Sequence, residues 1–296
     1  MKTPIALGLG EILWDVLPGG RKLGGAPANF AYHVNALGGT GIPVSRIGKD
    51  DLGREALDIL QAKGIATSLI DVDIEHPTGT VNADIDEQGV ATYTFPDDVA
   101  WDFLEPTEHG MAMAAKADII CFGTLAQRSS CSRNTIAAYL QHAPNTLKIY
   151  DINLRQSFYD KERILSSLQM ADVLKINDEE LTVVASLLSL PEDEETALRS
   201  LLSQFDLELA VLTRGENGSL LLTENASSDL PGVATTVVDT VGAGDSFTAA
   251  LALGWHKGLE LDDINRYAAT VAAHVCRHAG GMPEMRADMH IDRKSE

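Results

Sequence analysis

Residues 172 to 176 read Asp-Val-Leu-Lys-Ile and residues 208 to 213 read Glu-Leu-Ala-Val-Leu-Thr, and both runs are short and mostly apolar. Such runs are typical of strands that are buried on both faces of a parallel sheet. The same character recurs in earlier segments of the chain, at residues 4 to 9, 42 to 47, 118 to 122 and 147 to 152. The chain is therefore expected to form a mainly parallel sheet.

Helical patterns lie between these predicted strands. Residues 27 to 38 place Phe30 and Val34 on one apolar stripe, and residues 52 to 63 show a similar stripe. The alternation of strands and helices predicts a three-layer, doubly wound α/β fold, in which residues 1 to 296 form a single domain.

Two segments, residues 12 to 22 and 78 to 95, read as strands with turns and have no helix between the strands. The turns are Pro18-Gly19-Gly20 and Asp86-Glu-Gln-Gly89. The two segments predict a separate small sheet, inserted near the N-terminal half of the α/β core. Two interpretations of this sheet stay open: a lid over a ligand site, or a decoration with no part in catalysis.

Composition and charge exclude several classes of partner. The net charge is −20, so nucleic acid and anionic membrane surfaces would be repelled. The same charge would also repel an anionic ligand such as ATP, so any nucleotide site would have to be attractive locally, through backbone N–H groups, a helix N-terminus, a few basic residues and Mg²⁺.

The location of the protein follows from two further features of the sequence. No apolar stretch approaches the roughly 20 residues that span a bilayer, and the N-terminus lacks the pattern of a signal peptide. The three cysteines form no CxxC pair, which favours a reducing compartment. A cytoplasmic protein with no membrane partner is expected.

The clearest chemistry lies in the turn Asp239-Thr-Val-Gly-Ala-Gly-Asp245, which leads into an apolar helical segment at residues 246 to 258. Small residues before a helix allow backbone N–H groups to converge on an anion, and the helix dipole adds positive charge there. Gly242, Ala243 and Gly244 are thus candidates for stabilising a transferred phosphoryl group. Asp245 is the candidate base that takes the proton from an attacking hydroxyl. The alternative is a Gly-rich turn with Asp245 as an ordinary N-cap.

This turn resembles the C-terminal signature of the ribokinase, or PfkB, family of carbohydrate kinases. A second segment, Gly24-Gly-Ala-Pro-Ala-Asn-Phe-Ala31, resembles the N-terminal signature of the same family, in the family's order. The resemblance extends over essentially the whole chain. It implies a ribokinase-like fold, dependence on ATP and Mg²⁺, and transfer of the γ-phosphate of ATP to a sugar hydroxyl.

The sugar-binding candidates combine this resemblance with residue chemistry. Gly25 allows the backbone to approach a polyol closely, and Asn29 offers both donors and acceptors for neutral hydroxyl groups. The resemblance implies that Asp15 accepts from a second hydroxyl; a solvated charge is the alternative. Arg155 is expected to contact the sugar or the moving phosphate, and a surface ion pair is its alternative.

The nucleotide and Mg²⁺ candidates follow the predicted strands at residues 172 to 176 and 208 to 213. Asn177-Asp-Glu-Glu180 matches the family's Asn-x-x-Glu, so the resemblance implies that Asn177 and Glu180 hold Mg²⁺ through water. A helix N-cap with an acidic first turn is another explanation, compatible with the first. Thr213-Arg-Gly-Glu-Asn-Gly218 resembles the family's nucleotide-binding turn. The nucleotide-binding candidates are Asn177, Thr213, Gly215, Gly218 and Gly244.

A monovalent cation is a further implied cofactor. Asp239 and the backbone of Val241 resemble a monovalent-cation site of some family members, in which a loop such as Arg277 to Pro283 supplies the remaining ligands. Potassium therefore joins ATP and Mg²⁺ among the expected cofactors.

Substrate choice rests on two short segments. Glu11-Ile-Leu-Trp-Asp15 and Val99-Ala-Trp-Asp102 are similar to the fructokinases of the family, so fructose, phosphorylated at its 6-hydroxyl, leads the list. Trp101 is interpreted either as a stacking platform for the sugar or as core packing. Alternatives are a kinase of ribose, 2-keto-3-deoxygluconate or a nucleoside, and a catalytically silent sugar-binding regulator. A homodimer formed through the lid is also implied by the resemblance.

Overall fold

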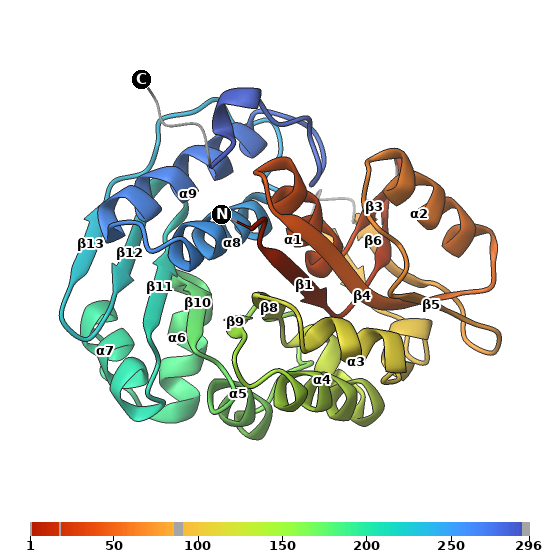
Figure 1. Ribbon diagram of the computed structural model, residues 1–296, viewed down its shortest axis with the longest axis horizontal. Coiled ribbons are helices and arrows are strands. Elements are labelled where there is room, and N and C mark those ends of the chain that lie inside the picture. The colour runs from red at the N-terminus through yellow and green to blue at the C-terminus, as the bar shows by residue number, and fades with distance from the viewer. Residues whose placement is uncertain (1, 18, 86–90, 292–296) are drawn as a thin grey trace.

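The computed structural model describes residues 2–17, 19–85 and 91–291, and its large sheet has the order β13-β12-β11-β10-β9-β8-β1-β4-β5 (Figure 1). The strands are β1 (Ile5–Leu9), β4 (Thr40–Gly48), β5 (Ile70–Asp73), β8 (Ile119–Phe122), β9 (Leu147–Asp151), β10 (Val173–Asn177), β11 (Leu209–Thr213), β12 (Ser219–Leu222) and β13 (Ser227–Leu230). All neighbours are parallel except β11 with β12 and β12 with β13. The prediction of a mainly parallel sheet is confirmed. The six predicted strands correspond to β1, β4, β8, β9, β10 and β11.

Helices cover both faces of this sheet (Figure 1). One face carries α1 (Ala26–Ala36), α8 (Ala243–His256) and α9 (Leu261–Cys276), and the other carries α3 (Glu108–Ala114), α4 (Ser130–His142), α5 (Lys161–Leu168), α6 (Asp178–Leu188) and α7 (Glu194–Gln204). Each face has its own apolar core, because strand side chains alternate between the two sides. This is the predicted three-layer α/β fold. No helix in the described ranges is long and apolar enough to cross a bilayer.

The predicted separate sheet is present, with the order β3-β2-β6-β7. Its strands are β2 (Leu13–Leu17), β3 (Gly20–Gly24), β6 (Gly79–Ile85) and β7 (Ala91–Thr94). The central pair, β2 and β6, is parallel, so the two predicted segments combine into one sheet instead of two separate hairpins. Helix α2 (Asp51–Ala62) lies beside it (Figure 1). Pro18 and the predicted turn at residues 86 to 89 fall outside the described residues.

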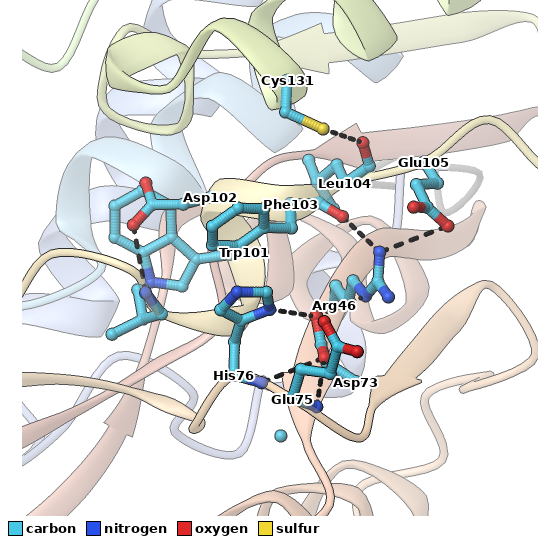
Figure 2. Close-up of polar contacts among 12 residues, drawn as sticks. Arg46, Asp73, Glu75, His76, Trp101, Asp102, Phe103, Leu104, Glu105 and Cys131 are labelled. Atoms are coloured by element: carbon cyan, nitrogen blue, oxygen red, sulfur yellow. Dashed lines mark hydrogen bonds and ion pairs between the residues drawn. The ribbon is translucent and has the colours of Figure 1, made fainter.

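The connection from the large sheet to the small one is held by a buried carboxylate at the end of β5 (Figure 2). Asp73 accepts hydrogen bonds from the backbone N–H groups of Glu75 at 2.8 Å and His76 at 3.0 Å. Its Oδ2 also lies 3.0 Å from Arg46 Nε and 3.0 Å from His76 Nδ1. The His76 ring stacks on Phe103, with centroids 3.6 Å apart. These contacts fix where the chain enters the small sheet.

Candidate active site

The Gly-rich turn forms the start of α8. Gly242 is the N-cap and has φ 76°, a conformation that suits glycine, and a Cβ there would lie 2.6 Å from the Cα of Gly281. The helix begins at Ala243, three residues earlier than the sequence indicated, so Asp245 lies in its first turn. The N-cap interpretation of Asp245 is therefore wrong. Ala243 N–H donates to Thr240 O at 3.2 Å within the turn.

The two signature segments meet at Asp245. Asn29, from the first turns of α1, donates from Nδ2 to Asp245 Oδ2 at 2.7 Å. Burial, followed by the negative charge of Asp151, raises the pKa of Asp245 to about 6, although Asn29, Lys175 and Arg155 act in the opposite direction. A carboxylate with such a pKa is largely ionised at neutral pH and is a stronger base than an exposed aspartate.

A buried ion pair lies beneath the turn. Lys175 of β10 donates to Asp151 Oδ1 at 3.0 Å, and both side chains are 8% exposed. Thr248 of α8 donates to the other oxygen of Asp151 at 2.7 Å. Burial alone would lower the pKa of Lys175, but the charges of Asp151 and Glu180 hold it above its usual value. A Cβ on Gly244 would lie 3.1 Å from Lys175 Nζ, so this ammonium group lies directly beside the turn.

Sequence reasoning did not single out Lys175. The sequence did contain a signal for this residue, because a lysine interrupts the apolar run Val173-Leu-Lys-Ile176 of a predicted buried strand. A lysine inside a buried strand needs a carboxylate partner, and this partner is expected at the end of a neighbouring strand.

Asn177 and Glu180 form the cap of α6. Asn177 Oδ1 accepts from Glu180 N–H at 2.7 Å, and Glu180 Oε2 accepts from Asn177 N–H at 3.0 Å, which is a capping box. Glu180 Oε1 accepts from Leu154 N–H at 2.8 Å. The helix-cap explanation is therefore correct. Burial raises the pKa of Glu180, while Lys175 and the backbone N–H groups act against the increase.

The predicted nucleotide-binding turn lies next to Asn177. Thr213 ends β11 and is the register partner of Asn177 at the carboxyl edge of the sheet. Gly215 and Gly218 have φ 54° and 96° in the tight connection to β12, where Arg214 N–H donates to Gly218 O at 2.8 Å. Ligands of open α/β sheets collect at this edge, near strand ends such as these.

The sugar-binding candidates come from three segments. A Cβ on Gly24 would lie 2.6 Å from Asp15 Oδ2, so the Asp15 carboxylate lies over the N-terminal signature. Gly25 has φ 115°, and a Cβ there would lie 2.4 Å from Glu11 O. Burial raises the pKa values of Asp15 and Asp245, and the charge of the exposed Arg155 acts against both increases, so its guanidinium lies within electrostatic range of both carboxylates.

Asp239 accepts hydrogen bonds from three donors of the protein itself. Oδ1 accepts from Val241 N–H at 3.1 Å, and Oδ2 accepts from Gly280 N–H at 2.9 Å and from Lys22 Nζ at 3.0 Å. The loop of residues 277 to 283 thus reaches Asp239, as expected. Lys22, from β3 of the small sheet, was not foreseen, and it links that sheet to the Gly-rich turn.

Trp101 is not available as a stacking platform. It is 2% exposed, and the guanidinium of Arg128 lies over its ring at 4.1 Å. Arg128 also pairs with the neighbouring Asp102, at 2.6 Å. Trp101 is therefore core packing, the second of its two interpretations.

The described residues also limit the metal chemistry. In residues 2–17, 19–85 and 91–291, no group of three or more His, Cys, Asp or Glu side chains is arranged to hold a metal ion directly. Asn177 and Glu180 offer oxygen atoms with unused lone pairs, and these suit a hydrated Mg²⁺ better than a stripped ion.

The fold and the site together define a class, an α/β protein with a half-buried carboxylate in the first turn of a helix that follows a Gly-rich turn. Residues 18–287 match the model of the pfkB family carbohydrate kinases. The chain therefore belongs to this family and is an ATP-dependent sugar kinase.

Individual relatives agree with this assignment. The chain is 30% identical over 268 residues to the fructokinase of Escherichia coli, covering 86% of each chain. It superimposes on the ATP-bound fructokinase of Xylella fastidiosa with a TM-score of 0.82, at 24% identity and covering 96% and 94% of the two chains. A double mutant of the Vibrio cholerae fructokinase, solved with fructose, ADP and potassium, gives 0.81 at 24% identity, covering 95% and 94%.

Proposed function

We propose that this kinase transfers the γ-phosphate of ATP to the 6-hydroxyl of fructose and forms fructose 6-phosphate. The observation that carries the chemistry is the contact between Asn29 and Asp245, which unites the two signatures at the N-terminus of α8. The named relatives support fructose as the sugar.

Asp245 acts as the base in this proposal. It takes the proton of the sugar hydroxyl while that oxygen forms its bond to the γ-phosphorus and the bond to ADP breaks. Gly242, Ala243 and Gly244 direct the helix N-terminus toward the transferred group, where the helix dipole stabilises negative charge. Lys175, beside Gly244, adds a buried positive charge.

The sugar and nucleotide lie on either side of this turn. Asp15, Gly25, Asn29 and Arg155 bind the sugar beneath the small sheet, which closes over it as a lid. At the other side, the nucleotide-binding set holds ATP at the carboxyl edge of the large sheet. This set consists of Asn177, Thr213, Gly215, Gly218 and Gly244.

The sugar preference is testable with a panel of fructose, ribose, glucose, 2-keto-3-deoxygluconate and adenosine. We expect fructose to give the highest kcat/KM in an ADP-release assay, because a site that hydrogen-bonds each hydroxyl rejects analogues that leave its groups unpaired. Asp15→Ala should raise KM for fructose far more than KM for ATP. Asp58→Ala, on the exposed side of α2, is the matched control and should change neither.

The panel separates the alternatives. A preference for ribose or adenosine by more than about tenfold would replace fructose but keep the kinase. If none of the panel compounds supports ATP consumption, the silent sugar-binding regulator is favoured.

Magnesium binding is proposed at Asn177 and Glu180, through water. Mg²⁺ there would neutralise charge on the phosphates, which the acidic chain otherwise repels. Activity should disappear in EDTA and return with Mg²⁺, and Glu180→Gln should raise the Mg²⁺ concentration required. Glu179→Gln, the exposed neighbour, should leave the Mg²⁺ curve unchanged. Equal curves for wild type and Glu180→Gln would reduce Glu180 to a capping residue.

Potassium binding and dimerisation complete the proposal. A potassium ion at Asp239 and the Val241 backbone would compete with the Lys22 ammonium group for the same carboxylate. Titration of activity with KCl against a non-binding salt measures this requirement. The homodimer through the small sheet is measured by sedimentation equilibrium.

A further inference from the structure

Glu11 is a buried carboxyl group beside the base, and the proposed mechanism leaves it unused. It follows β1 and Gly10, and it is 5% exposed. Glu11, Asp151 and Asp245 line one cavity of about 20 Å³, among the carboxyl ends of β1, β8 and β9 and the helices α1 and α8. The three carboxyl side chains interrupt a lining that is otherwise mainly apolar, and they supply the hydrogen-bonding partners that about one water molecule needs in a cavity of this volume.

The charges around this cavity are unbalanced. Besides Glu11, the titratable and charged groups that line the cavity or act on the groups lining it are Cys121 of β8, Asp151 of β9, Arg155 after β9, Lys175 of β10 and Asp245 of α8. Helix α1 contributes only Ala26, Pro27 and Phe30 to the lining. Lys175 contacts Asp151 at 3.0 Å, so its positive charge mainly offsets that carboxylate and acts on Asp245 from farther away. Arg155 is exposed and screened by solvent.

Two carboxyl groups, Glu11 and Asp245, therefore share the remaining space. Like charges in a buried site do not ionise together at low cost, and one group keeps its proton. Burial raises the pKa of Glu11 to about 7, and the charge of Asp245 adds to the increase, while the N–H groups of Glu11 and Ala26 and the charge of Arg155 oppose it. Burial and the charge of Asp151 raise the pKa of Asp245 to about 6, and the hydrogen bond from Asn29 and the charges of Lys175 and Arg155 limit this increase because they support the ionised form.

We propose that Glu11 stays protonated while Asp245 acts as the base, and that its hydroxyl donates, through one water in the shared cavity, to the Asp245 carboxylate. Asn29 holds Asp245 Oδ2 from one side, and the water supports the carboxylate from the cavity side. Glu11 is a positioning residue: its proton is not consumed, since the proton of the sugar goes to Asp245. The inference rests on the proposed role of Asp245 as the base.

The test compares Glu11→Gln, Glu11→Ala and the control Glu195→Gln, which changes an exposed glutamate of α7. Glutamine has the shape and the donor of the protonated acid, so Glu11→Gln should keep kcat within about threefold near pH 7. Glu11→Ala removes the donor and should lower kcat by roughly 10- to 100-fold, the range for misplacing a reacting group.

The pH profile gives the second readout. Wild-type kcat/KM should decline above about pH 7, as Glu11 ionises and loses its donor. Glu11→Gln should lack this decline but keep the rise of kcat/KM through about pH 6 that Asp245 causes. Glu195→Gln should keep both the rise and the decline. A loss in Glu11→Gln as large as in Glu11→Ala, full activity in Glu11→Ala, or an alkaline decline that persists in Glu11→Gln would each overturn the proposal.

Thermal unfolding separates this inference from the proposed function, because it needs no substrate. A carboxyl group whose folded-state pKa is raised above its unfolded value of 4.5 costs stability as pH rises from 4.5 to about 7. The melting temperature should therefore fall less between pH 5 and pH 8 in Glu11→Gln than in wild type. Equal falls would refute a protonated Glu11 even if no panel sugar is phosphorylated.

Discussion

Asp245→Asn will lower kcat by roughly 10² to 10⁴, the usual loss when a positioned base is removed, while the fold and ATP binding remain intact. Asparagine keeps the shape of the side chain and accepts the 2.7 Å hydrogen bond from Asn29. It removes only the capacity to take a proton. The measurements are single-turnover kinetics for the chemical step and calorimetry for ATP affinity.

The wild-type pH profile provides a linked expectation. Because Asp245 must be ionised to act and its pKa is about 6, kcat/KM should rise as pH increases through about 6. Asp262→Asn, an exposed aspartate in the first turn of α9, is the matched control and should preserve both rate and profile. Turnover near that of wild type in Asp245→Asn would remove Asp245 from the mechanism.

Lys175→Met will destabilise the protein by about 3–5 kcal/mol, because it leaves the Asp151 carboxylate buried without its ion-pair partner. Asp151 would keep the hydrogen bond from Thr248, which does not neutralise its charge. Methionine matches the length of lysine and fits an apolar strand, so the loss reports the charge and not a cavity. Urea denaturation gives the free energy of unfolding.

A double variant makes this expectation sharper. Lys175→Met combined with Asp151→Asn should recover more than half of the lost stability, since no unpaired charge then remains buried. Arg266→Met breaks an ion pair with Asp263 in which the side chains are 61% and 62% exposed. This change should lower the free energy of unfolding by less than about 1 kcal/mol. A Lys175→Met loss no larger than that of Arg266→Met would show that Asp151 is solvated or protonated.

The strands β1, β4 and β8 to β11 of the large sheet were predictable because burial on both faces leaves a continuous apolar run in the sequence. The start of α8 was harder to predict from the sequence. Gly242, Ala243 and Gly244 are small residues without an apolar pattern, and glycine is a weak helix former, so the helix was expected to begin at Ser246. The short strands β5, β12 and β13 were not predicted, since few residues distinguish them from loops.

The sequence by itself determined the α/β class, the separate small sheet and the place of Asp245 at a helix start, because these depend on local pattern and on short motifs. Tertiary structure alone decided which groups meet there. Asn29 contacts Asp245 across 216 positions, and Lys22 contacts Asp239 across 217. Such contacts, and the shared cavity of Glu11 and Asp245, depend on how strand ends and helices converge in space, which local pattern does not encode.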